Sequence, residues 1–203
     1  MQPNLKSTLL DEVQQLFHRH GVRALSEDQI ITSLSISPAT FYEMFQDKND
    51  LVDQAARHDL ERQKREHAAM FAKAGSPVER ILLLLQHGIK ELRNIPGTLY
   101  SEIQQDHPQT WAMMLDHLAT YSYPQIHNLL NDGILQKQFR SDINIELVTK
   151  IILEQVNLLL NADIFPPSRY NLSEVFRSIY LYYIRGICTD EGFKLVAAHF
   201  SKA

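Results

Sequence analysis

The sequence predicts an all-α fold in which a small N-terminal helical domain precedes a larger one. Apolar residues recur at three- and four-residue spacing in one segment after another, and Ser, Pro and Gly stand where helices are expected to begin and end. The 203 residues are 44% hydrophobic and 22% charged, with only 7 Gly and 8 Pro. This composition excludes disordered and collagen-like chains. The length suits one large domain, or a small domain joined to a medium one.

Three features of the sequence favour a protein of the reducing cytoplasm. Leu9 and Leu10 are soon followed by acidic residues, so no signal peptide is expected. The longest apolar run, residues 81–85, is far shorter than the roughly 20 residues that span a bilayer. The single cysteine, Cys188, has no partner for a disulfide and lies in an apolar run, which indicates a buried, inert thiol.

The N-terminal region predicts two helices. In the first, apolar residues lie at helical spacing, and Gly21 supplies the stop expected just past the helix end. These apolar residues are Leu9, Leu10, Val13, Leu16 and Phe17. Ser26, followed three positions later by Gln29, has the form of a capping box that opens a second, short helix.

A third short helix is predicted after the link at residues 35–37. Ser37 can cap it, and Pro38 falls in its first turn, where a missing N–H costs nothing. Phe41 and Phe45 share a face and are its expected anchor. Two short helices joined by a tight turn match the helix-turn-helix pattern, in which the second helix enters the DNA major groove. The predicted shared core is Val13, Leu16, Phe17, Ile30, Ile31, Leu34, Ile36, Phe41 and Phe45.

The rest of the chain is also predicted to be helical. A long helix begins at Asp47 or Lys48 and includes residues 57–67, whose mixed charges indicate a solvated bridge. Further helices are expected over residues 78–94, 100–107, 109–121, 124–135, 145–161 and 172–187. The predicted domains are therefore residues 1–50, a helix-turn-helix domain, and residues 51–203, a second helical domain.

The N-terminal segment resembles the DNA-binding domain of TetR-family transcriptional regulators. The likeness lies in the helix lengths, in the F-x-x-x-G ending of the first helix, and above all in a T-F-Y-x-x-F-x-x-K-x-x-L run. That run is Thr40, Phe41, Tyr42, Phe45, Lys48 and Leu51. The resemblance covers about a quarter of the chain. The later stretch YIRGICTDEG, residues 183–192, is similar to the end of the family's last helix.

The resemblance implies roles for the third helix and its flanks. Thr40, Tyr42 and Lys48 match positions that contact phosphates, and the helix N-terminus at Lys48 offers free N–H groups as well. Pro38, Ala39 and Glu43 match the face turned to base edges. The predicted DNA-binding set is Ser37, Pro38, Ala39, Thr40, Tyr42, Glu43 and Lys48.

Charge and turn chemistry depart from the pattern of a simple DNA reader. Residues 1–50 carry a net charge of −3, whereas a DNA-binding domain is expected to be basic. Their charged residues are Lys6, Arg19, Arg23 and Lys48 against Asp11, Glu12, Glu27, Asp28, Glu43, Asp47 and Asp50. Glu43 repels phosphate, although it can accept from cytosine N4. Ser35 occupies a turn position that is usually Gly, and a positive φ there would cost about 1 kcal/mol.

Two C-terminal segments, residues 145–160 and 172–187, are apolar over so much of their circumference that they need cover on more than one side. A second copy of the chain supplies that cover most simply, as a twofold four-helix interface. The alternative is that both helices are interior to a monomer. The predicted interface set is Ile152, Val156, Leu159, Phe176, Ile179, Tyr180 and Tyr183.

The middle helices could enclose a small-molecule effector, because their aromatic and polar residues suit a mostly apolar pocket. Plain core packing is the alternative for each of them. The predicted pocket set is Tyr100, His107, Trp111, Met114, His117 and Tyr121. No Glu-x-x-His pair, Gly-rich phosphate loop or G-x-S-x-G elbow occurs, so no enzyme, cofactor or metal site is expected.

These patterns together favour a dimeric TetR-like transcriptional regulator. It is expected to be a repressor that binds a palindromic operator in double-stranded DNA and is released by a small-molecule effector. The alternative is a TetR-like dimer that has lost or weakened operator binding and serves as a small-molecule or protein-binding module. The acidic first domain supports that alternative.

Overall fold

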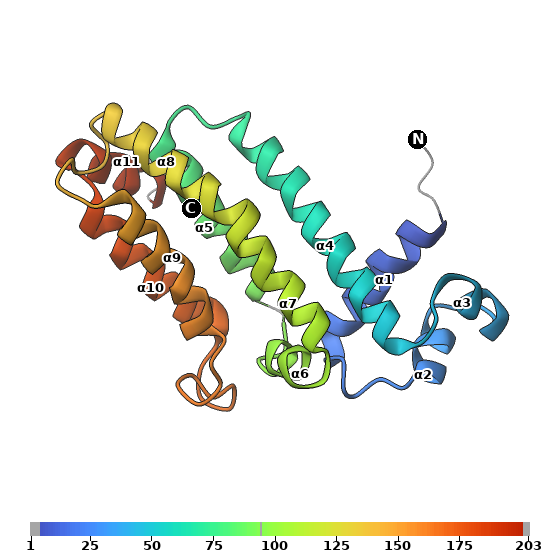
Figure 1. The fold of residues 1–203 in the computed structure, drawn as a ribbon. Coiled ribbons are helices and arrows are strands. Elements are labelled where there is room, and N and C mark those ends of the chain that lie inside the picture. Colours follow the sequence, from blue (N-terminus) through green and yellow to red (C-terminus); the bar gives the residue numbers. More distant parts are fainter. Residues whose placement is uncertain (1–4, 94, 201–203) are drawn as a thin grey trace. The chain divides into compact units, whose positions relative to one another are not determined.

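The computed structural model describes residues 5–93 and 95–200, and the named elements within these residues are all helices (Figure 1), apart from one isolated β-bridge between Phe139 and Cys188. The elements are α1 (Leu5–His20), α2 (Glu27–Ser33), α3 (Pro38–Met44), α4 (Lys48–Phe71), α5 (Pro77–Leu92), α6 (Leu99–Asp106), α7 (Pro108–His117), the π-helix η1 (Leu118–Ser122), α8 (Tyr123–Leu135), α9 (Ile145–Leu159), α10 (Leu172–Ile187) and α11 (Asp190–Phe200). The predicted all-α fold class is confirmed.

The chain forms two compact units, each with its own hydrophobic core. Within the described residues, unit 1 comprises 5–65 and 95–116, and unit 2 comprises 66–93 and 117–200. Helix α4 contributes residues to both. Unit 1 thus adds α6 and most of α7 to the first three helices, whereas the functional division predicted at residue 50 stays a prediction.

The helices of unit 1 begin where the local sequence predicts. Ser26 and Gln29 form a complete capping box, in which each side chain bonds the backbone of the other. Ser37 caps α3 by accepting from the Thr40 amide at 3.0 Å. Phe41 and Phe45 are buried and anchor α3, although it has only 7 residues. The predicted core is confirmed, with Leu16 and Ile36 at its partly buried edge.

Two turns of unit 1 adopt left-handed backbone conformations. Ser35, between α2 and α3, has a φ of 53°, so this serine carries the strain expected of a non-glycine residue, about 1 kcal/mol. Gly21, after α1, has a φ of 79°. The positive φ favours glycine there, and a Cβ atom at Gly21 would also lie 2.8 Å from Oε2 of Glu102 and displace this carboxylate.

Unit 2 is built around α5, α8, α9 and α10. Leu82 and Leu130 are fully buried in its core, and Gly88 of α5 lets the Phe176 ring of α10 approach its backbone. The Tyr180 hydroxyl of α10 donates to the Ile152 carbonyl of α9 at 2.8 Å. Among the residues that the structure describes, no helix is both long enough and apolar enough to cross a membrane.

Three expectations about helix ends need correction. The segments predicted at residues 109–121 and 124–135 are continuous, because η1 bridges them with one wide π turn; Pro124 has no N–H to donate to the preceding turn. The ending seen at residues 183–192 is not the last, because α11 follows it, with Thr189 Oγ1 accepting from the Gly192 amide at 3.1 Å. Helix α5 ends at Leu92, and the predicted end at Asn94 lies outside the described residues.

Candidate nucleic-acid interface and ligand cavity

Helix α3 presents one anchored face and one exposed face. Phe41 is fully buried on the inner side, and Tyr42 packs edge-on against its ring while remaining 54% exposed. Pro38, Ala39 and Glu43 are exposed as well. The predicted base-reading face is therefore turned to solvent, as a recognition helix requires.

Glu27, the first residue of α2, binds two of the donors predicted to reach phosphate. The Tyr42 hydroxyl donates to its Oε2 at 3.0 Å, and the Lys48 amide donates to its Oε1 at 2.9 Å. The hydrogen bond to this carboxylate, and then its charge, raise the pKa of Tyr42. A carboxylate thus occupies the donors that a phosphate would use.

The other predicted phosphate contacts are also engaged within unit 1. The Thr40 hydroxyl lies 2.8 Å from Ser37 Oγ, and Lys48 Nζ donates to the Leu25 carbonyl at 2.6 Å. Partial burial lowers the pKa of Lys48. Thr40, Tyr42 and Lys48, the three residues predicted to contact phosphate, therefore all have hydrogen-bond partners within unit 1.

The end of α1 is tied to α6 by a carboxylate. Glu102 Oε2 accepts from the Val22 amide at 2.8 Å and from the Arg23 amide at 3.0 Å, while Oε1 accepts from the Thr98 hydroxyl. The Arg23 guanidinium also pairs with Asp106 at 2.8 Å. A shift of α6 would therefore move or break the contacts of the turn that leads into α2.

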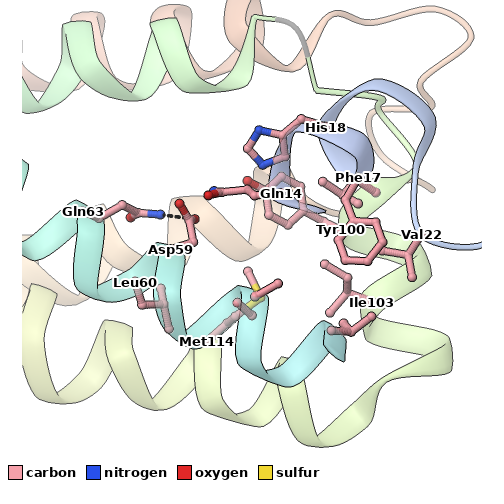
Figure 2. Close-up of a pocket in the computed structure, with 14 residues that line it drawn as sticks. Gln14, Phe17, His18, Val22, Asp59, Leu60, Gln63, Tyr100, Ile103 and Met114 are labelled. Carbon is pink, nitrogen blue, oxygen red and sulfur yellow. Dashed lines mark hydrogen bonds between the residues drawn. The ribbon is translucent and has the colours of Figure 1, made fainter. Parts of the chain in front are cut away.

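A cavity of about 80 Å³ lies within unit 1, between α1, α4, α6 and α7 (Figure 2). Its walls are mostly apolar, with Phe17, Ile103 and Met114 on one side. On the other side, the Gln14 amide points from α1 toward Asp59 and Gln63 of α4 (Figure 2). The complete lining is Gln14, Phe17, His18, Val22, Val52, Ala55, Ala56, Asp59, Leu60, Gln63, Leu99, Tyr100, Ile103 and Met114.

The six residues predicted to form the effector pocket are distributed over both units. Tyr100 and Met114 line the cavity of unit 1. Trp111 packs at the edge of the core of that unit, and His107 is buried there, which lowers its pKa. His117 and Tyr121 belong to unit 2 and pack against each other, with ring centroids 4.8 Å apart. The assignment of these six to one effector pocket stays a prediction.

Histidines gather in unit 2. His67 stacks on Phe71 and Tyr121 and meets the His87 ring edge-on. Burial, followed by the neighbouring histidines, lowers the pKa of His67 to about 4. Across residues 5–93 and 95–200, no set of three or more His, Cys, Asp or Glu side chains is arranged to hold a metal ion.

The residues predicted for the dimer interface are placed differently from one another. Ile152, Leu159 and Tyr180 are buried within the single chain, and Ile152 and Tyr180 belong to the core of unit 2. Val156, Phe176, Ile179 and Tyr183 are half-buried at the edge of that core. The exposed large apolar side chains of α9 and α10 are Leu147, Ile151, Leu158 and Tyr182.

Sequence reasoning did not single out Glu27, Gln14 or Glu102. The bonds that Glu27 and Glu102 make to other elements span 15 to 80 positions of sequence, and the cavity that Gln14 faces is lined by four separate helices. One signal for Gln14 was present in the sequence. It is a polar residue next to Val13 in the otherwise apolar stripe of α1.

Comparisons with known proteins agree with this geometry. Residues 9–55 match the family model described as bacterial regulatory proteins, tetR family. The chain is also similar to the HTH-type transcriptional repressor KstR2 of Mycobacterium tuberculosis, with 24% identity over 156 residues that span 72% of this chain and 75% of the relative.

Solved structures share the fold over most of their length. The KstR2 structure from Mycobacterium tuberculosis has a TM-score of 0.63 at 18% identity and covers 94% of this chain and 98% of its own. A TetR-family regulator from Agrobacterium tumefaciens has a TM-score of 0.72 at 17% identity, and the match covers 92% of this chain and 100% of that regulator. FadR from Bacillus subtilis, in complex with stearoyl-CoA, has a TM-score of 0.66 at 14% identity, and the match covers 88% of this chain and 97% of FadR.

Proposed function

We propose that this chain is a one-component transcriptional repressor. Its residues 9–55 match the TetR-family model. As a homodimer it binds a palindromic operator, and it leaves the operator when a small molecule binds. The observation that carries the proposal is the exposed face of α3, formed by Ala39, Tyr42 and Glu43 on a helix anchored through Phe41. The proposal assigns the protein to the cytoplasm, with no enzymatic activity and no cofactor.

The exposed apolar residues of α9 and α10 support the proposed homodimer. Leu147 is 56% exposed and Tyr182 is 68% exposed, on helices whose inner faces already fill the core of unit 2. A second copy would cover these side chains, and twofold symmetry would place two copies of α3 in successive major grooves.

The names of the relatives support a small-molecule effector. One structural neighbour is a ketosteroid regulator by its name, and another was solved with stearoyl-CoA bound. We propose release by population shift, in which the effector favours a pose where α4 turns the two reading helices out of register with the grooves. Dimers crosslinked in the DNA-spacing pose should no longer respond to the effector, and a persisting response would contradict this mechanism.

Operator selection from a random duplex library, at low salt, tests the function. The purified protein is compared with a Thr40→Ala, Tyr42→Ala, Lys48→Ala variant. The control carries Lys73→Ala and Tyr170→Ala, which alter exposed residues outside the motif. Enrichment of one palindrome by the wild type and the control, lost in the triple variant, is the expected result.

A second candidate function is a TetR-like dimer with weak or lost operator binding that serves as a small-molecule or protein-binding module. The hydrogen bonds from Tyr42 and Lys48 to Glu27 favour it, together with the net charge of −3 over residues 1–50. A folded dimer that enriches no sequence at any salt concentration would select this function over the repressor.

A further inference from the structure

We propose that the cavity of unit 1 binds a compact, uncharged and largely apolar molecule whose carbonyl or hydroxyl oxygen accepts a hydrogen bond from Gln14. The effector pocket predicted from the sequence lay in the middle helices alone. This cavity also includes residues of α1, the first helix of the proposed DNA-reading head, which comprises α1, α2 and α3. The regulatory consequence rests on the proposed function, but ligand binding itself does not.

Gln14 identifies the polar end of the cavity. Its side chain lies on the cavity wall, is only 9% exposed, and has an Nε2 atom with no hydrogen-bond partner. Buried amides are nearly always satisfied, because an unpaired donor loses its water without compensation. A ligand oxygen in the cavity would supply the missing acceptor.

The charge of the neighbouring Asp59 carboxylate is already compensated by hydrogen bonds. Both oxygens of Asp59 accept hydrogen bonds, Oδ1 from Arg62 and Oδ2 from Gln63. The carboxylate therefore needs no cation from the ligand, and it would repel an anion. This arrangement favours an uncharged molecule over a carboxylate or an amine.

The apolar part of the cavity wall and the cavity volume determine which apolar groups the ligand can carry. Phe17, Val52, Leu99, Ile103 and Met114 give an apolar surface, which suits hydrocarbon. The volume of about 80 Å³ is well below the roughly 300–1,000 Å³ of sites for drug-sized ligands. The ligand class is thus a molecule of about one ring that carries a single polar oxygen.

The site can act on the reading head because its walls also support that head. Phe17 lies both in the cavity wall and in the core that anchors α3. Ile103 lies next to Glu102, which holds the turn after α1. The Thr110 hydroxyl of α7 donates to Asp53 of α4, so the walls are linked to each other as well. A ligand that separates these helices would distort the packing that holds α2 and α3 in place.

The test uses two molecules of matched shape, cyclohexanone and methylenecyclohexane, of which only the first has an oxygen acceptor. Binding is followed on the full-length protein without DNA, through the ¹³C-methyl signal of Met114 in the cavity wall. The methyl signal of Met70, which does not line the cavity, is the internal reference. Met→Leu variants assign the two signals.

We expect cyclohexanone to shift the Met114 signal with a Kd about tenfold lower than that of methylenecyclohexane, since only the ketone pairs the buried donor. Gln14→Leu should reduce this ratio to about one. Ala56→Leu, which fills the cavity, should abolish binding of both molecules, whereas Ala69→Leu, at an exposed position of the same helix, should leave it unchanged.

Three results would overturn the proposal: equal affinity of the wild type for the two molecules, unchanged cyclohexanone affinity in a folded Ala56→Leu variant, or no movement of the Met114 signal at saturating ketone. Operator affinity is then measured with and without ketone. Failure of operator selection with an intact Met114 response rejects the repressor and leaves the site standing. A selected operator with no Met114 response rejects the site and leaves the repressor.

Discussion

Among single residues, Glu27 bears most directly on the proposed DNA binding by helices α1 to α3. Its carboxylate accepts from the Tyr42 hydroxyl and the Lys48 amide, the same groups that the sequence assigns to phosphate. A phosphate must displace it while being repelled by its charge. If the proposed function holds, Glu27 competes with the operator for these two donors.

Replacing Glu27 by Gln should raise DNA affinity about fivefold at low salt. The amide keeps an acceptor oxygen, while the lost unit charge, some 4 Å from the expected phosphate, was worth about 1 kcal/mol of repulsion. Fluorescence anisotropy with a duplex measures the change. The control is Glu12→Gln, which removes the charge of an exposed residue on α1. An equal gain in affinity in both variants would show that net charge alone causes the effect.

Gln14→Leu should stabilise the folded protein by about 1 kcal/mol. The change replaces a buried donor that has no partner with an apolar side chain that needs none. Urea unfolding followed by circular dichroism gives the difference. Gln15→Leu, at the exposed neighbouring position, should have a much smaller effect, and a similar gain there would show that helix propensity is the cause.

At the scale of elements, local sequence signals were sufficient for the short helices of unit 1. Ser26 with Gln29, and Ser37 with Pro38, set helix starts through contacts three residues apart, and the structure shows both caps. The positive φ of Ser35 follows from the tight turn between two such helices. Signals of this range are fully contained in the sequence.

Other elements depend on partners far along the chain, which explains why the sequence did not predict them. Helix α11 begins after Thr189, whose hydroxyl donates to the Lys137 carbonyl 52 positions earlier. The cavity needs four helices to come together, and the bonds of Glu27 need α2 to meet both α3 and α4. Tertiary packing, and no local pattern, determines these features.

Loss of the α3 cap should destabilise unit 1. Ser37→Ala removes the acceptor for the Thr40 amide and should cost about 1 kcal/mol. The midpoint of urea unfolding measures it. Ser33→Ala is the matched control, because the Ser33 hydroxyl only donates to the Gln29 carbonyl one turn back in α2. A cost as large for Ser33→Ala would contradict the capping interpretation.

For the whole molecule, the histidine cluster of unit 2 makes stability depend on pH. The pKa of His67 falls to about 4 in the folded state, so protonation favours the unfolded chain. Its contribution to stability should be complete above about pH 6.5 and should decline as the pH falls toward 4. Thermal melts across this range should show the loss, reduced in His67→Phe and unchanged in the exposed control His20→Phe.

The assembly is also a property of the whole molecule. Ile151→Glu places a charge on the exposed apolar face of α9 and should turn the proposed dimer into a monomer, as measured by sedimentation velocity. Leu195→Glu, which alters a similarly exposed apolar residue on α11, should leave the dimer intact. Dissociation only in the Leu195→Glu variant would move the interface to α11.

The single cysteine has a practical consequence for measuring how the two α3 helices of the proposed dimer move. Burial raises the pKa of Cys188 to about 11, so only about one thiol in 10⁴ is ionised at neutral pH and reaction with maleimides is slow. A cysteine placed at exposed Gln46, just after α3, can therefore be spin-labelled selectively in the otherwise native chain. Pulsed electron paramagnetic resonance would then report the separation of the two reading helices directly in solution.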